Sequence, residues 1–194
     1  MIIALAGRRV DPTDATPARF SPEQAAPVLD RVRSLLEDLE ATTLVGSGAC
    51  GADLLAMQAA GGLGLRRRMV LPFEPARFRE KSVVDRPGDW GPLFDQVTSE
   101  LATSGDLIVL GEREDSAAYV ATNLAILDEA LRLARGTRPD REAGVIAVVV
   151  WDGQERGPGD MTADFARQAC ARGLTVTEVS TRADDPDDPN PTRS

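Results

Sequence analysis

No histidine occurs in this chain of 194 residues, which removes the commonest general base and the commonest metal ligand in proteins. Proton transfer would have to use a carboxylate, the single tyrosine Tyr119 or the thiol of Cys50. Cysteine is scarce too, because Cys50 and Cys170 are too few for a disulfide framework and have no histidine to complete a zinc site. We therefore expect no metal site, and the sequence indicates no cofactor.

Long apolar runs are missing as well. No stretch could span a membrane, and the N-terminus lacks the basic start, apolar middle and cleavage site of a signal peptide. Basic residues number 22 against 31 acidic ones, which gives a net charge of -9. This balance disfavours a nucleic-acid-binding surface, but it allows a small phosphorylated ligand held by a few arginines. We expect a cytoplasmic protein without a membrane or nucleic-acid partner.

What is present is typical of one globular domain. Hydrophobic residues make up 42% of the chain and charged residues 27%, and the length allows a substantial core. Residues 183–194 read ADDPDDPNPTRS, an acidic and proline-rich segment without an apolar face. We therefore predict a single domain over residues 1–182 and a disordered acidic tail over residues 183–194.

One stretch, TTLVGSGACGADLLAMQAA at residues 42–60, predicts a strand, a tight loop and a helix. Its glycines at positions 46, 48 and 51 have the spacing G-x-G-x-x-G, which lets a backbone approach a ligand closely. The first turn of a following helix offers unpaired amides and a positive dipole end to an anion such as phosphate. The alternative is that the glycines only make a tight turn.

Apolar strand-like runs alternate with helical patterns along the whole chain. We expect strands near residues 2–5, 42–45, 69–71, 106–110, 145–150 and 175–179. Helices are expected near residues 21–40, 53–60, 94–101, 120–131 and 161–170, and residues 74–91 are expected to form an ordered loop or lid with some helix. This alternation predicts an α/β fold, with a parallel sheet and helices on both faces.

Ligands of such sheets bind outside the carboxyl ends of the strands, where the strand order reverses. That rule brings five segments to one edge: residues 7–9, 46–51, 72–73, 111 and 151–162. Arg8 and Arg9 directly follow the first strand, so either could bind a phosphate there, or both could be solvated surface residues.

Several motifs, read together, resemble the SLOG superfamily of Rossmann-like domains. They are GSGACGADLLAMQAA from Gly46, LPFEPARF from Leu71, WDG from Trp151 and GPGDMTADFARQACARGLTV from Gly157. This superfamily joins the Lonely Guy phosphoribohydrolases, the Smf DNA-processing proteins and bacterial sensor domains thought to bind nucleotides or nucleotide-derived signals. The resemblance covers residues 2 to about 180 and implies a bacterial, Rossmann-like nucleotide-binding domain.

The resemblance implies a nucleotide held along the sheet edge by two loops. Gly46, Ser47, Gly48 and Gly51 would contact it through the first loop, and Gly159, Met161 and Thr162 would bind its phosphate through the second. Asp53 would accept from ligand hydroxyls or brace the loop, and Trp151 or Phe73 would stack on a base or pack. The full set of candidate ligand-binding residues is Gly7, Arg8, Arg9, Gly46, Ser47, Gly48, Ala49, Cys50, Gly51, Asp53, Pro72, Phe73, Asn123, Trp151, Asp152, Gly153, Gly159, Met161 and Thr162.

The second loop departs from the hydrolase pattern. Lonely Guy enzymes carry P-G-G-x-G-T-x-x-E, and alignment on the threonine puts Phe165 at the catalytic glutamate and Met161 at a glycine. Asp164 is one residue away, which turns a helical side chain by about 100°. Asp160 places a negative charge beside the expected phosphate, which weakens anion binding unless an arginine compensates. These departures favour a sensor that binds without turnover.

Two other functions stay open. The chain could be an N-glycoside hydrolase acting on nucleoside monophosphates, with Asp164, Asp152 or, less favoured, Glu112 as its catalytic carboxylate. It could instead be a structural or partner-binding protein whose loops hold no ligand. Related domains form homodimers, so a homodimer is expected here, and the effector of such a sensor could be a separate chain.

Overall fold

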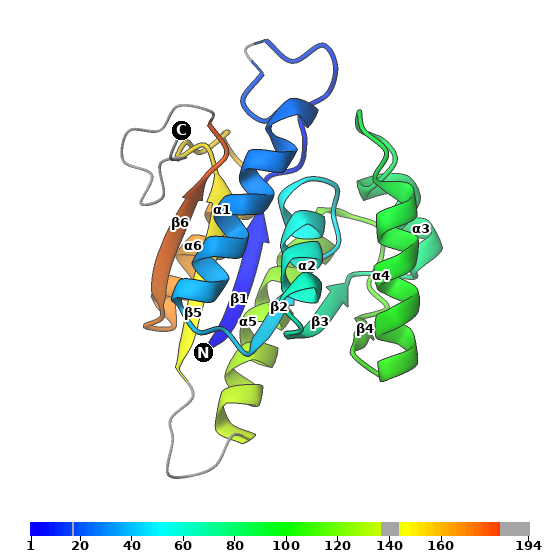
Figure 1. The fold of residues 1–194 in the computed structure, drawn as a ribbon. Coiled ribbons are helices and arrows are strands. Elements are labelled where there is room, and N and C mark those ends of the chain that lie inside the picture. Colours follow the sequence, from blue (N-terminus) through cyan, green and yellow to red (C-terminus); the bar gives the residue numbers. More distant parts are fainter. Residues whose placement is uncertain (17, 137–143, 183–194) are drawn as a thin grey trace.

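A computed structural model describes residues 1–16, 18–136 and 144–182. Within these residues, six parallel strands form one sheet in the order β4-β3-β2-β1-β5-β6 (Figure 1). The strands are β1 (Ile2–Gly7), β2 (Thr43–Gly46), β3 (Arg66–Leu71), β4 (Leu107–Val109), β5 (Val145–Trp151) and β6 (Thr175–Ser180). The predicted tail, residues 183–194, lies outside the described residues.

Helices cover both faces of the sheet, which confirms the predicted fold class. One face packs against α1 (Ala25–Asp38), α2 (Ala52–Gly62), α3 (Pro75–Ser82) and α4 (Gly91–Ser104). The other face packs against α5 (Ser116–Gly136) and α6 (Met161–Ala171). A short 3₁₀ turn, η1 (Pro22–Gln24), precedes α1, and its Ser21 and Gln24 form the capping box that the sequence SPEQ predicts.

The central strand β1 shows why these residues form a parallel sheet. Its side chains alternate between faces, so Ile3 and Leu5 enter one core while Ile2 and Ala4 enter the other. A strand buried on both faces needs a continuous apolar run rather than alternation, and IIALA supplies it.

The strand order reverses beside β1. From β1 the chain proceeds to β2, β3 and β4 on one side, and then crosses to β5 and β6 on the other. Loops that leave the carboxyl ends of β1 and β5 therefore diverge, and a crevice opens between them. This crevice is where a parallel α/β sheet places a ligand.

Two segments differ from, or add detail to, the sequence expectation. The arginines at 66–68 belong to β3 rather than preceding it, and Arg68 pairs with Asp106 at 2.9 Å and with Glu129 at 2.6 Å. Within residues 74–91, the expected lid contains α3 followed by a loop into α4.

In the part of the chain that the structure describes, every helix is too short or too polar to cross a membrane.

Candidate functional site

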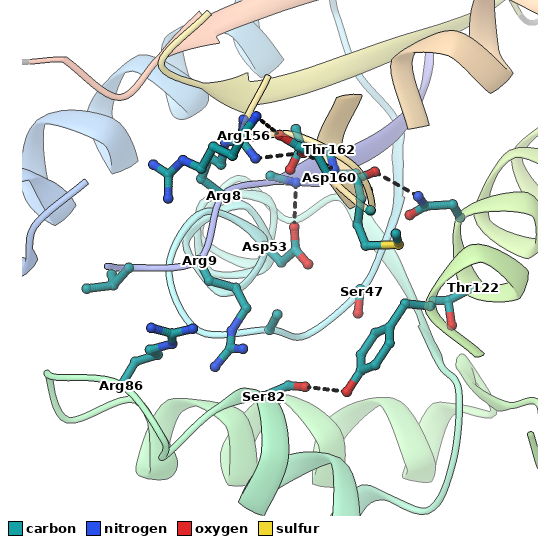
Figure 2. Close-up of a pocket in the computed structure, with 18 of the residues that line it drawn as sticks. Arg8, Arg9, Ser47, Asp53, Ser82, Arg86, Thr122, Arg156, Asp160 and Thr162 are labelled. Atoms are coloured by element: carbon teal, nitrogen blue, oxygen red, sulfur yellow. Dashed lines mark hydrogen bonds and ion pairs between the residues drawn. The ribbon is translucent and has the colours of Figure 1, made fainter. Parts of the chain in front are cut away.

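A pocket of about 500 Å³ lies over the carboxyl ends of β1, β2 and β5. Its walls come from the end of β1, the loop after β2, α3, α5 and the loop that leads into α6 (Figure 2). Both loops that the sequence singles out therefore contribute to one cavity. Ten predicted ligand-binding residues line it: Gly7, Arg8, Arg9, Ser47, Ala49, Asp53, Asn123, Gly159, Met161 and Thr162.

The other predicted residues lie outside the set of described residues that lines this pocket. Phe73 lines a neighbouring cavity of about 390 Å³, which shares Gly159 and Met161 with the main pocket. Asn123 connects one predicted catalytic residue to the site, because its amide donates to Asp164 at 3.2 Å and to the carbonyl of Met161 at 2.8 Å. The remaining predicted residues are Gly46, Gly48, Cys50, Gly51, Pro72, Trp151, Asp152 and Gly153.

The glycines of the first loop each have a packing role. A Cβ on Gly48 would lie 2.9 Å from the Met69 side chain, and one on Gly46 would lie 3.2 Å from the Leu5 carbonyl. Gly51 has a φ of 94°, and a Cβ there would lie 2.8 Å from the Arg8 carbonyl. Close packing thus explains the glycine at positions 46 and 48, and a positive φ together with close packing explains Gly51.

Asp53, in the first turn of α2, points toward the centre of the pocket (Figure 2). Its Oδ1 accepts the amide of Gly7 at 2.8 Å. Burial raises the pKa of Asp53 to about 7, and the amides of Gly7 and Ala49 and the charge of Arg9 offset this only in part. Asp53 therefore braces β1 against α2 and presents a carboxyl group that changes charge near neutral pH.

Three arginines and three aspartates form a network of ion pairs, which we call the ion network. Its members Arg8, Arg156 and Asp160 lie in the upper part of Figure 2. Arg8 bonds Asp160 at 2.6 Å and lies 3.5 Å from Asp152, which also pairs with Arg19 at 3.3 Å. Arg156 pairs with Asp11 at 2.5 Å. The members of the ion network are Arg8, Asp11, Arg19, Asp152, Arg156 and Asp160.

The pKa values of two aspartates reflect this network. Burial raises the pKa of Asp11, but three other interactions together lower it by more. These are the hydrogen bonds from the amides of Arg19 and Phe20 and the contact with the Arg156 guanidinium, so the pKa of Asp11 is lowered overall. For Asp160, burial is likewise outweighed by the amide of Arg156 and the side chain of Arg8, and its pKa is lowered. Both carboxylates are therefore charged at neutral pH and form ion pairs with their arginine partners.

Asp160 also caps α6. Its Oδ1 accepts the amides of Thr162 at 3.0 Å and Ala163 at 3.1 Å, while its Oδ2 accepts the amide of Arg156 at 2.7 Å. The sequence predicts that Asp160 weakens anion binding unless an arginine compensates. Arg8 does compensate its charge, but the two helix-start amides already have a carboxylate partner.

A second basic cluster lies at the opposite wall, where Arg9 and Arg86 share Asp85. Arg9 bonds Asp85 through Nη2, and the Nε of Arg86 lies 3.6 Å from the same carboxylate. Burial lowers the pKa of Arg9, but contacts with Asp85 and the Cys50 thiol raise it by more. For Cys50 the largest effect is burial, which raises its pKa, so this thiol is neutral.

Trp151 contacts Arg8 rather than lining the pocket. The Arg8 guanidinium carbon lies 5.5 Å from the centre of the Trp151 ring, and the indole donates to Glu178 at 2.8 Å. The stacking of Trp151 on a base stays a prediction.

The pocket contains residues that sequence reasoning did not assign to a binding site. From α3 and its following loop come Phe78, Ser82 and Arg86, and from α5 come Tyr119 and Thr122. The Ser82 and Tyr119 hydroxyls lie 3.2 Å apart. Asp11 and Arg156 were also missed. The one sequence signal for these residues was the expectation of an ordered lid at residues 74–91. The local sequence of a lid does not show which strand end it will cover.

The fold and the pocket over the reversal of strand order define a Rossmann-like α/β domain. Among solved structures, the chain is similar to DNA processing protein A from Streptococcus pneumoniae, with 14% sequence identity and a TM-score of 0.41. The match covers 91% of this chain and 58% of that one, so the chain spans less than two thirds of that protein. This likeness concerns the fold alone. No family model and no curated protein sequence matches the chain.

Proposed function

We propose that the pocket binds a nucleotide or nucleotide-derived ligand and that the protein acts as a sensor without turnover. The observation that carries this proposal is the convergence of both helix-start loops, with the end of β1, on a single cavity of about 500 Å³. Cavities that bury small ligands typically measure about 300–1,000 Å³.

The chemistry of the walls supports the same proposal. A nucleotide presents an apolar base face, hydroxyl groups and an anion. Phe78, Ile126 and Met161 supply apolar surface, while the carboxyl of Asp53 can accept from a hydroxyl group. Arginines at two walls offer positive charge.

Hydrolysis of an N-glycosidic bond is the second candidate, and Asp53 is the observation in its favour. A carboxyl group with a pKa near 7, facing a cavity, resembles the general acids of glycoside hydrolysis. Asp152, in contrast, is engaged in the ion network, and Asp164 accepts from Asn123. Long incubation with nucleoside monophosphates separates the two functions, because a sensor releases no free base and a hydrolase releases it stoichiometrically with ribose phosphate.

Isothermal calorimetry with mono-, di- and cyclic nucleotides tests the proposed binding. Ser47 points into the pocket (Figure 2), so Ser47→Trp should fill it and remove measurable binding. Ser99→Trp is the matched control, because Ser99 lies exposed on α4 and its replacement should preserve the affinity. Thermal unfolding of both variants verifies that they fold. The proposal fails if no nucleotide binds, or if Ser47→Trp binds as tightly as Ser99→Trp.

A further inference from the structure

Positive charge in the pocket is distributed unevenly. The ion network contains three arginines and three aspartates, so its formal charges cancel. At the opposite wall, Arg9 and Arg86 share the single carboxylate of Asp85. Two cations against the Asp85 carboxylate leave a formal excess of one positive charge there while Asp53, whose pKa of about 7 is lowered by the charge of Arg9, is protonated. An incoming anion thus gains most from the wall of Arg9 and Arg86.

Several backbone amides at the helix starts already have partners. Thr162 and Ala163 donate to Asp160 at the start of α6. At the first loop, the Cys50 amide donates to the Ser82 carbonyl at 2.9 Å and the Ala52 amide to the Arg8 carbonyl at 3.0 Å. Anion binding at these donors would require the protein to release the groups that they now satisfy.

The two walls also differ in how readily a carboxylate can be displaced. The Asp160 side chain is 0% exposed and its partner Arg8 is 7% exposed, so an anion replacing Asp160 would leave a buried carboxylate unpaired. Asp85 is 34% exposed and Arg9 is 30% exposed. Asp85 can therefore move into water, where an ion pair is weak and a free carboxylate is well solvated.

Donors without a hydrogen bond occur at both walls. Among the described residues, the buried Nε atoms of Arg9 and Arg86 have no hydrogen-bond partner, and neither has the Nε of Arg8, which lies 3.5 Å from Asp152 in the ion network. Their guanidinium groups lie close together in Figure 2, and both arginines pair with the carboxylate of Asp85. A phosphate oxygen placed there would satisfy donors that the protein leaves unpaired.

We propose that the anionic group of the ligand binds between Arg9 and Arg86, and not at the start of α6. This placement rests on the nucleotide-binding function proposed above. The phosphate of a nucleotide then lies against α3 and its following loop. Recognition of the anion is thus assigned to two side chains rather than to the glycine-containing loops.

Calorimetry with four matched probe pairs tests this placement: adenosine and AMP, guanosine and GMP, cytidine and CMP, and uridine and UMP. The readout is the phosphate preference, defined as the Kd of the nucleoside divided by the Kd of its monophosphate. Arg86→Gln should lower this preference by about tenfold or more, because a charge-assisted contact is lost. Arg86→Lys keeps the charge and should retain most of it.

Arg156→Gln is the matched control, since Arg156 lines the pocket on the side of α6. It should lower the phosphate preference much less than Arg86→Gln does, even where it changes both affinities together. A loss of preference in Arg156→Gln but not in Arg86→Gln would overturn the placement, and so would an unchanged preference in both. Nucleosides that bind as tightly as their monophosphates would overturn it while leaving nucleoside recognition intact. If neither nucleosides nor nucleotides bind the wild-type protein, the proposed function itself fails.

Discussion

Asp53 occupies the first turn of α2, a favourable position for a carboxylate, yet burial keeps its pKa near 7. An ordinary aspartate has a pKa of 3.8, so between these two values the folded protein holds a proton that the unfolded chain has lost. Stability contributed by the neutral carboxyl is therefore fully present below the unfolded pKa, and it is lost as the pH rises toward 7.

This difference predicts a pH-dependent effect of Asp53→Asn, which keeps an acceptor for Gly7 but cannot ionise. Relative to the wild type, the variant should gain stability between pH 4 and pH 7, by an amount on the order of a few kcal/mol. Urea unfolding of both proteins at pH 5 and pH 8 gives the two differences in free energy. Equal differences at the two pH values would show that Asp53 is ionised throughout.

At the scale of single elements, Asp160 joins the start of α6 to Arg8 at the end of β1. Asp160→Ala removes the N-terminal cap of α6, and loss of such a cap costs about 0.5–2 kcal/mol of stability. The substitution also leaves Arg8 buried without this partner, and breaking a buried ion pair typically costs about 3–5 kcal/mol. We expect urea unfolding to show a combined destabilisation of roughly 3 kcal/mol or more.

Arg167→Ala on the same helix is the control for Asp160→Ala. Its ion pair with Glu155 joins two side chains that are each about half exposed, so its loss should cost less than about 1 kcal/mol. Similar small effects in both variants would mean that Asp160 is not structurally important.

A second element-scale feature is the close approach of β1 to α2, which explains Gly7. A Cβ on Gly7 would lie 2.4 Å from the Cβ of Ala52, so Gly7→Ala should destabilise the fold by about 1–3 kcal/mol. The double variant with Ala52→Gly relieves this clash and should recover part of the loss, despite the helix cost of glycine. Additive destabilisation in a thermodynamic double-mutant cycle would contradict this explanation.

For the whole molecule, the sequence was sufficient to predict the layered architecture. Local periodicity separates the strands from the helices, and the rule for parallel sheets then brings Gly7, Ser47 and Gly159 to one edge. The ion network could not be predicted, because Asp11, Arg156 and their partners meet only after the chain folds. Phe78 and Arg86 were missed for the same reason.

The predicted homodimer, separate effector and SLOG membership remain predictions. Among the described residues, the exposed large hydrophobic side chains are Met1 and Val84. Size-exclusion chromatography with light scattering would measure the mass in solution, and a single mass near 20.7 kDa would contradict the homodimer.

The central claim is that the two helix-start loops hold one nucleotide between them. A crystal structure with the tightest-binding nucleotide of the calorimetric panel tests this most directly. We predict that the ligand occupies the pocket and contacts both residues 46–51 and residues 157–162. A nucleotide that lies outside the pocket, or contacts only one of these loops, would contradict the account.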